Sequence, residues 1–256
     1  MRFATEYCPR YPRTLLSRSV DLREAAANRA ASANEYREIL CHIPGGSTGI
    51  DAAAGLGIGT GLLAARSRQV IGIEISEERL SAARQENEDR GNIIWLRKDL
   101  NEIPGLLPLY SEPVDYVVSL QTIEHLFSPA LFLMAARAAL KTGGLLIVSA
   151  PAVQTTDLNP YHLHDFTPNS LKEMVESAGF SITGLQITSS VQPLSWANPF
   201  KRAGRVMPNI VPRSLLLKNM AEVYWQNPLK FLRRCYSLAS DFGFPRGSVR
   251  IEARKE

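Results

Sequence analysis

Short apolar runs alternate with longer segments of helical pattern between residues 48 and 187. Runs this apolar, separated by helices, are typical of parallel strands in a sheet that is covered on both faces. The pattern therefore predicts an α/β fold in which helices wind over both sides of a parallel sheet. The expected strands are 48–53, 69–75, 92–99, 114–120, 144–150, 181–189 and a closing run at 248–254.

Helix-boundary residues agree with this division of the chain. Ser76 is placed to cap the helix that follows the second strand. Thr167 and Pro168 are expected to begin a later helix that ends at Gly179, because proline suits the first helical position and glycine the stop. Gly143 is expected to end the helix that begins near residue 129.

The chain divides into four predicted parts. Residues 1–45 are expected to form a helical lead or lid, and residues 46–188 the cofactor-binding core. Residues 189–247 break the strand and helix alternation and are interpreted as a basic cap insertion. Residues 248–256 are expected to return to the core as its final edge strand.

The apolar runs are shorter than the roughly 20 residues that a membrane-spanning helix needs. The first residues carry charges and prolines where a secretory signal has an apolar stretch, so we expect a cytoplasmic protein. Cys8, Cys41 and Cys235 are too few and too widely spaced for a disulfide framework or a structural zinc site. We expect them to be ordinary buried thiols, and we assign no metal ligand.

Charge is distributed unevenly along the chain. Residues 1–188 carry 17 Lys and Arg against 21 Asp and Glu, whereas residues 189–256 carry 12 against 4. Arginine suits bidentate contact with phosphate, so a phosphate-bearing small-molecule acceptor fits this basic segment. A solvated basic face and an anionic membrane surface are the alternatives. Nucleic acid is disfavoured because the chain carries no recognised nucleic-acid-binding module.

Four glycines lie within residues 55–61, directly after the first predicted strand. A phosphate-binding P-loop is excluded because Leu62, and not lysine, follows Gly61. The dinucleotide fingerprint fits only in a relaxed form, Gly59-x-Gly61-x-x-Ala64, which lies far from the strand end. The spacing of the residues suits S-adenosylmethionine better than a dinucleotide, with Asp51 closing the strand and Gly55, Gly57 and Gly59 forming the loop.

Glu74 ends the second predicted strand, 19 residues after Gly55. A carboxylate there can accept hydrogen bonds from both ribose hydroxyls of a nucleotide cofactor. This residue therefore supports S-adenosylmethionine and a dinucleotide equally.

Six consecutive stretches resemble the class I S-adenosylmethionine-dependent methyltransferases, and within them a branch associated with glycan and polysaccharide biosynthesis. The resemblance implies a Rossmann-like, mostly parallel seven-stranded sheet with an N-terminal helical segment and a C-terminal cap insertion. Ala53 stands where the commonest first glycine of that family lies, and Ala54 replaces a frequent cysteine. The matching stretches are GIDAAAGLGIGTGLLA, VIGIEIS, LRKDL, VDYVVSLQTIEHL, LKTGGLLIVSAP and NPYHLHDFTPNSLKEMVESAGF, within residues 49–180.

The same resemblance implies which residues contact the cofactor. Ala53, Gly55 and Gly57 are expected beside its methionine part, and Gln121 beside its sulfonium end. Glu74 is expected at the ribose, and Asp99 and Leu100 at the adenine. Asp51 and Ile75 complete the expected cofactor-binding set.

The expected reaction is O-methylation of a small hydroxylated acceptor, such as a nucleotide- or lipid-linked sugar. The acceptor hydroxyl must then lose a proton. A neutral histidine suits that step. His162 is the preferred base and His125 the second candidate; the alternative for either is a loop histidine that caps a turn, with Asp165 or Tyr161 as partner. His42, before the first strand, is expected to be structural. A nicotinamide-dependent oxidoreductase and a non-catalytic cofactor-binding subunit are the competing functions.

Overall fold

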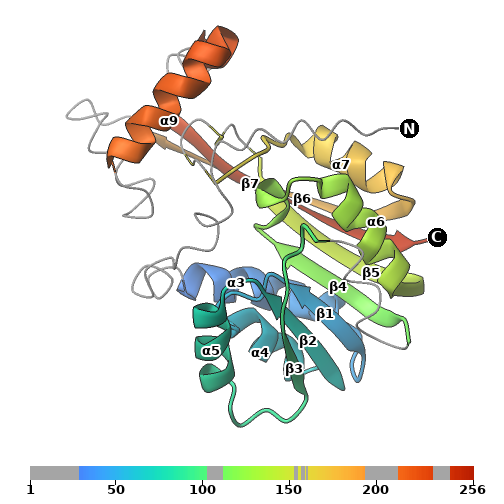
Figure 1. Cartoon of the computed structure of the whole chain (residues 1–256). Helices are drawn as coiled ribbons and strands as arrows, with labels where there is room; N and C mark the ends of the chain where they lie inside the picture. The colour runs from blue at the N-terminus through green and yellow to red at the C-terminus, as the bar shows by residue number, and fades with distance from the viewer. Residues whose placement is uncertain are drawn as a thin grey trace.

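The computed structural model describes residues 29–102, 112–152, 155, 156, 159, 161–193, 213–232 and 243–256. Within them seven strands form one sheet in the order β3-β2-β1-β4-β5-β7-β6 (Figure 1). Strands β3, β2, β1, β4 and β5 pair in parallel, and β7 runs antiparallel to both of its neighbours. The predicted fold class is confirmed. The strands are β1 (Thr48–Ala52), β2 (Gln69–Glu74), β3 (Ile93–Arg97), β4 (Val114–Leu120), β5 (Leu140–Pro151), β6 (Phe180–Pro193) and β7 (Gly243–Lys255).

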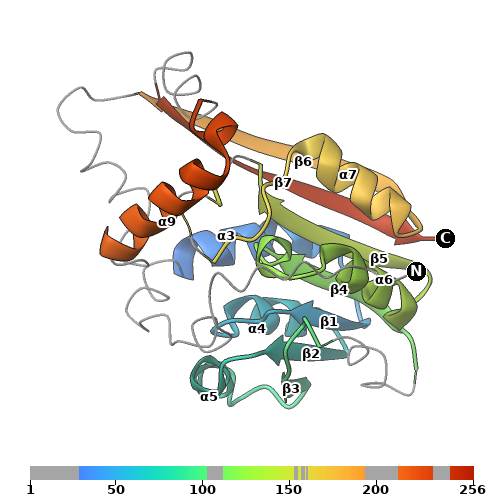
Figure 2. The same cartoon turned by 45° about the horizontal axis from the view of Figure 1, so that its top comes forward.

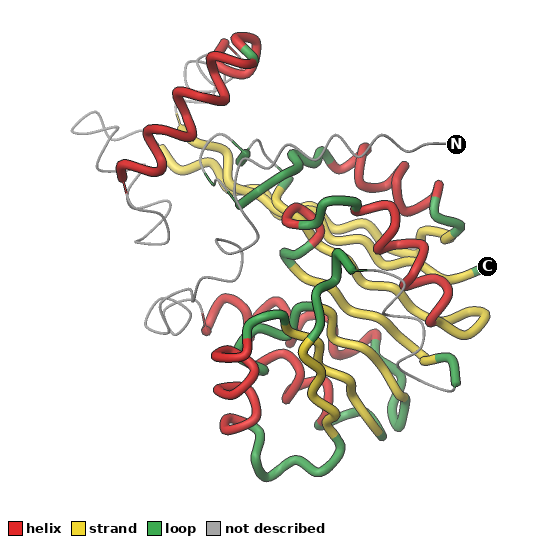
Figure 3. The backbone as a smooth tube through the Cα atoms, viewed as in Figure 1, coloured by secondary structure: helices red, strands yellow, loops and turns green. Residues whose placement is uncertain are grey.

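Helices cover both faces of the sheet, so the fold has three layers; Figure 3 shows the helices in red and the strands of the sheet in yellow. On one face, Tyr36, Ile39 and Leu63 share a buried cluster with residues of β2, β4 and β5. On the other face, Phe132 and Leu171 belong to a second buried cluster. Figure 1 shows α3 (Arg29–Ile39), α4 (Ile58–Ala64) and α5 (Glu77–Glu86) on the first side, and α6 (Pro129–Ala139) and α7 (Pro168–Ser177) on the other. Short 3-10 turns lie at η1 (Leu40–His42) and η3 (Ile123–His125).

The predicted caps of two helices are confirmed, whereas one predicted helix end is wrong. The Ser76 hydroxyl accepts from the Arg79 N–H at the start of α5, and Thr167 forms a capping box at the start of α7. Helix α6 ends at Ala139, four residues before Gly143, because Leu140 is already extended and pairs with Val114. Gly143, at φ 73°, instead lies within β5, at the irregularity between the Val114↔Leu140 and Tyr116↔Leu145 pairs.

The closing strand occupies a different place from the one expected. Strand β7 lies between β5 and β6, so β6 is the edge strand. Burial explains this order, because Val249, Ile251 and Ala253 of β7 are fully buried whereas Leu185 and Ile187 of β6 are about half exposed. The alternating apolar residues of β7 are therefore those of an interior strand.

The antiparallel pair of β6 and β7 continues past the end of β5, with pairs from Ser189↔Gly247 to Pro193↔Gly243. Figures 1 and 2 show helix α9 (Arg213–Gln226) beyond this extension, and a further helical turn spans residues 228–232. Among the described helices, none is long and apolar enough to cross a membrane. Cys41 is exposed, which corrects the expectation of a buried thiol, and Cys8 and Cys235 lie outside the described residues.

Candidate functional site

The turn after β1 lies directly against the end of β2. The Gly55 N–H donates to Glu74 Oε2 across 3.0 Å, and the Ser76 N–H donates to Glu74 Oε1 across 2.9 Å. Glu74 is buried, with 3% of its surface exposed. Ala53, Gly55 and Gly57 all have positive φ angles, of 69°, 58° and 75°. The predicted glycine turn and carboxylate therefore form one unit at the carboxyl edge of the parallel strands.

The four glycines of this segment have different tasks. A Cβ on Gly55 would meet no atom within 4 Å, so this residue faces open space. A Cβ on Gly57 would come within 2.8 Å of Ala83. Gly59 and Gly61 lie inside α4, where a Cβ would overlap the Tyr36 ring and the Asn87 amide respectively. The expectation that Gly59 belongs to the loop is wrong: it lets α3 pack closely on α4.

Asp51 lies within β1 and is fully buried. Its two carboxylate oxygens accept from the Tyr36 hydroxyl at 2.6 Å and from the Thr60 hydroxyl at 2.5 Å. Burial raises the pKa of Asp51 to about 6, although both hydroxyl donors lower it and Glu74 adds a like charge. This carboxylate therefore joins α3 and α4 beneath the glycine turn.

Gln121 follows β4 and has a left-handed backbone at φ 52°. Its N–H donates to the Ser149 carbonyl and hydroxyl, both at 3.1 Å, and the Ser149 hydroxyl donates to Glu35 across 2.7 Å. A non-glycine residue held in this region indicates a constrained position, of the kind often found at functional sites. Helix α3 thus contacts the ends of both β1 and β5.

Three further residues of the predicted cofactor set lie on the links after β2 and β3. Ile75 directly follows β2 and accepts from Arg97 Nε through its carbonyl. Asp99, half-buried after β3, accepts from both the backbone and the amide of Asn101, at 2.8 and 3.0 Å. Leu100 is buried in the core. All of them follow strands at the edge where the glycine turn lies.

Glu124, His125 and His162 form a compact cluster at the same edge. Their ligand-type atoms all lie within 4.8 Å of one another, and the two imidazole rings meet edge to face with centroids 4.6 Å apart. Burial lowers the pKa of His162 to about 3, helped by His125, and also lowers that of His125. Both rings are therefore neutral at neutral pH. Glu124 was not among the site residues predicted from the sequence. The available signal was an acidic residue next to a histidine, flanked by the apolar residues Ile123 and Leu126.

The partners expected for the loop histidines are found only in part. His162 Nδ1 contacts the Thr155 hydroxyl at 2.7 Å, and the Tyr161 carbonyl partners His125 at 2.9 Å. His164 contacts the Leu126 carbonyl. Asp165 instead accepts hydrogen bonds from the backbone of the loop after β5.

Asp165 organises the loop after β5. It accepts from the Thr155 and Thr156 backbone N–H groups at 2.6 and 2.9 Å, and from Lys230 at 3.0 Å. Burial raises the pKa of Asp165, but these donors outweigh it and hold the pKa below its usual range. Lys230, from the helical turn at 228–232, thus attaches the C-terminal segment to the loop that carries His162.

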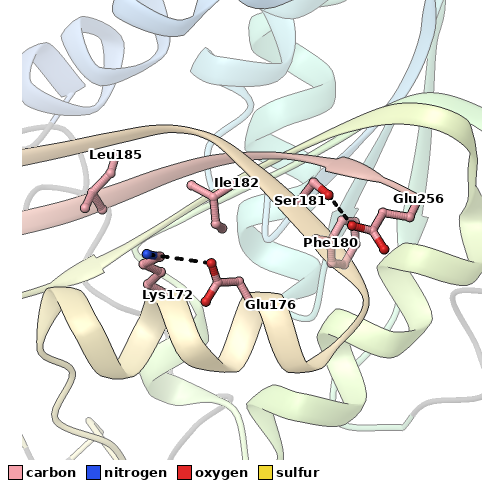
Figure 4. Close-up of a pocket in the computed structure, with 7 residues that line it drawn as sticks. All are labelled: Lys172, Glu176, Phe180, Ser181, Ile182, Leu185 and Glu256. Carbon is pink, nitrogen blue, oxygen red and sulfur yellow. Dashed lines mark hydrogen bonds and ion pairs between the residues drawn. The ribbon is translucent and has the colours of Figure 1, made fainter.

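Two other described features lie apart from this edge. His42 pairs with Glu252 at 3.0 Å, consistent with a structural role. A groove of about 540 Å³ lies between α7 and β6. Figure 4 shows its lining residues, among which Lys172 pairs with Glu176 and the Ser181 hydroxyl donates a hydrogen bond to Glu256. None of the predicted site residues lines this groove.

Comparison with known proteins identifies the segment that carries the glycine turn. Residues 50–148 match the methyltransferase domain family. A "Probable S-adenosylmethionine-dependent methyltransferase" of Mycolicibacterium smegmatis is 33% identical over 153 residues, which are 56% of this chain and 55% of that protein. One of Mycobacterium tuberculosis is 32% identical over 137 residues, which are 51% and 47% of the two chains. The chain thus spans about half the length of the curated relatives it matches.

Solved structures share the fold at low sequence identity. The N-methyltransferase NodS from Bradyrhizobium japonicum, in complex with S-adenosylhomocysteine, has a TM-score of 0.56 and 11% identity, covering 88% of this chain and 86% of its own. The [4+2]-cyclase SpnF has a TM-score of 0.58 and 18% identity, covering 88% and 80%. Because one neighbour is named a cyclase, the fold alone does not fix the reaction.

Proposed function

We propose that this chain, whose residues 50–148 match the methyltransferase domain family, transfers a methyl group from S-adenosylmethionine to a small hydroxylated acceptor. The contact between the Gly55 N–H and Glu74 carries this proposal. It places a buried carboxylate beside a turn whose backbone is open to a ligand. Each carboxylate oxygen accepts one backbone N–H and keeps a further lone pair for a ribose hydroxyl.

The remaining cofactor contacts follow from the positions along the same edge. Asp51 supports the glycine turn indirectly, because it accepts a hydrogen bond from Thr60 of α4, the helix that follows the turn. Gln121 is the candidate for the sulfonium end, because its constrained backbone follows β4 next to β1. In the proposed arrangement, Ala53, Gly55 and Gly57 adjoin the methionine part, Glu74 and Ile75 the ribose, and Asp99 and Leu100 the adenine.

The reaction itself asks mainly for placement of the acceptor. The acceptor oxygen bonds to the methyl carbon as the carbon–sulfur bond breaks, and that electron pair stays on sulfur, which leaves as a neutral thioether. In-line orientation can contribute roughly 7 to 11 kcal/mol to lowering such a barrier. The hydroxyl proton must also be removed, and His162, followed by His125, is the proposed acceptor because both rings are neutral.

A nucleotide-linked or lipid-linked sugar, handled in the cytoplasm, is the proposed acceptor class. Its support is the resemblance to the glycan-biosynthesis branch and the basic composition of residues 189–247. Lys230 is already paired with Asp165, so phosphate binding would fall to other basic residues of that segment. Of these, Lys218 is exposed, and the others lie outside the described side chains. An anionic membrane surface is the alternative partner of this segment.

Two competing functions remain distinguishable by experiment. A nicotinamide-dependent oxidoreductase would use the relaxed glycine fingerprint, but Gly59 and Gly61 are occupied in packing against Tyr36 and Asn87. A non-catalytic subunit would bind the cofactor without turnover.

Isothermal titration of the full chain with S-adenosylmethionine, S-adenosylhomocysteine, NAD⁺ and NADP⁺ tests the proposal. We expect binding of the first two alone, and about tenfold or greater weakening in Glu74→Gln. Glu77→Gln, an exposed acid three residues further along, is the matched control and should bind as the parent does. Release of S-adenosylhomocysteine in the presence of nucleotide sugars then tests the acceptor class. Binding of the nicotinamide cofactors in place of S-adenosylmethionine would overturn the proposal.

A further inference from the structure

Three side chains that commonly ligate metals meet where η3 faces the loop after β5. Glu124 and His125 come from η3 and His162 from the loop, and their ligand-type atoms lie within 4.8 Å of one another. Glu124 Oε1 is 3.8 Å from His125 Nε2. Two imidazoles and one carboxylate form a donor set that zinc and related transition ions use in proteins.

The carboxylate of Glu124 lacks a partner that its burial would normally require. Its side chain is 2% exposed, and Oε2 has no hydrogen-bond donor among the described residues. A buried carboxylate without such a donor is costly, since water no longer solvates it. A cation beside this oxygen would remove the deficit.

The imidazoles are oriented as metal-ligating histidines usually are. The Tyr161 carbonyl can only accept, so His125 must donate through Nδ1–H, which leaves the Nε2 lone pair free. His162 Nδ1 contacts the Thr155 hydroxyl, which leaves its Nε2 for another partner. Ligating histidines typically hold their second ring nitrogen to a carbonyl or another polar group in this way.

The backbone fixes the two segments against each other. The Glu124 carbonyl accepts from the Leu163 N–H at 2.8 Å and from the His164 N–H at 3.3 Å. Asp165 then anchors the loop to Thr155, the partner of His162. His125 is about one-third exposed, with 36% of its side chain accessible, which provides a route from solvent.

We propose that Glu124, His125 and His162 bind a divalent transition-metal ion of the Zn²⁺ or Mn²⁺ class. Metal–ligand bonds of about 2.1 Å require the ligand atoms to approach to roughly 3.4 Å in a tetrahedral site. The 3.8 Å separation of Glu124 Oε1 and His125 Nε2 lies close to this value, and the side chains would approach one another further on binding. Water or an acceptor oxygen completes the coordination.

The role of the ion rests on the proposed function, whereas its binding does not. A metal-bound hydroxyl loses its proton to solvent more readily, and its oxygen then attacks the methyl carbon while the carbon–sulfur electron pair moves to sulfur. The two histidines then act as ligands in place of proton acceptors. The ion would both orient and activate the acceptor.

The test uses full-length protein treated with a chelator and desalted, then titrated with Zn²⁺, Mn²⁺ and, as a harder ion, Mg²⁺. We expect one bound equivalent of Zn²⁺ or Mn²⁺ and weaker binding of Mg²⁺. Glu124→Gln and His162→Ala should each weaken binding by about tenfold or more. His164→Ala is the matched control, because this loop histidine contacts the Leu126 carbonyl and lies outside the cluster.

Circular dichroism and thermal unfolding establish that each variant is folded. Because two ligand variants are made, the test can still be read if one of them does not fold. Absence of binding to the folded parent, or binding that neither ligand variant weakens, overturns the inference. S-adenosylmethionine binding, measured in parallel, separates the two proposals. A folded parent protein that binds the cofactor but no metal ion defeats only the inference, and one that binds the metal ion but not the cofactor defeats only the proposed function.

Discussion

The hydroxyl of Tyr36 donates a 2.6 Å hydrogen bond to the carboxylate of Asp51 at the centre of the sheet. Both residues are buried, and the ring of Tyr36 also packs on Gly59 at the start of α4. Helix α3 therefore does more than cover the sheet. It supports the strand and the helix that flank the glycine turn, so the N-terminal segment contributes to the shape of the proposed cofactor site.

Tyr36→Phe should weaken both the fold and cofactor binding. Removing the phenol leaves a buried carboxylate oxygen of Asp51 without its donor, which typically costs about 1–3 kcal/mol. We expect the affinity for S-adenosylmethionine to fall by up to about tenfold, measured by calorimetry. Tyr116→Phe is the control, because that buried hydroxyl contacts Ser67 and its ring packs on Gly49, at the opposite end of β1. Equal affinities in the two variants would contradict a role for α3 in the site.

Asp51 should make stability depend on pH in a particular direction. Its pKa is about 6 in the folded protein against an ordinary 3.8, so between these values the native state holds a proton that the unfolded state has lost. Stability from this group is therefore present at low pH and lost as pH rises through about 6, by roughly 3 kcal/mol. Denaturant unfolding of the ligand-free parent and Asp51→Asn at pH 4.5 and 7.5 measures this.

The comparison with the Asn variant isolates one group, because all other titratable residues are common to the two proteins. We expect Asp51→Asn to gain stability relative to the parent on going from about pH 4.5 to 7.5. A difference between the two proteins that does not change with pH would show that Asp51 has an ordinary pKa.

Gly59→Ala should separate α3 from α4. The added Cβ would overlap the Tyr36 ring, so the ring or the helix must move, and overpacking of this kind costs about 1–3 kcal/mol. Gly91→Ala is the control, since a Cβ there meets nothing within 4 Å and Gly91 has no left-handed backbone. Its effect should stay within about 0.5 kcal/mol in thermal or denaturant unfolding. Similar losses in both variants would rule out close packing as the reason for Gly59.

The sequence predicted the secondary-structure elements and the glycine turn after β1 better than it predicted the side chains that pack around the proposed site. The strands, the Ser76 cap and the position of Glu74 follow from neighbours in sequence. The packing roles of Gly59 and Gly61 could not be predicted from neighbouring residues in the sequence. The side chains that fill their missing Cβ positions come from α3 and from the end of α5.

The misplaced closing strand has a similar cause. A chain that leaves the core for a long insertion can return at the edge or between two strands, and a local pattern does not choose between them. The alternation of buried Val249, Ile251 and Ala253 was the available signal for an interior strand.

Lys230→Gln should loosen the loop that carries His162 without weakening cofactor binding. Its ammonium group contacts Asp165 at 3.0 Å and the Thr156 hydroxyl at 2.8 Å. Hydrogen exchange of the backbone amides of Thr155 and Thr156, which donate to Asp165, should accelerate. Lys218→Gln, on the exposed side of α9, is the matched control and should leave this exchange unchanged. Unaltered protection in Lys230→Gln would mean that the loop is held without the C-terminal segment.

Ala53→Gly should be neutral or stabilising, although alanine-to-glycine changes usually destabilise. Ala53 has φ 69°, a left-handed conformation that costs an L-residue about 1–2 kcal/mol. Glycine relieves this strain, and the relief offsets its greater loss of backbone entropy on folding. Ala82→Gly within α5 provides the opposite case, because helical backbone gives no strain to relieve, and it should cost about 1 kcal/mol. If denaturant unfolding gives both variants the same loss, Ala53 is not strained, and the turn after β1 owes its shape to Gly55 and Gly57 alone.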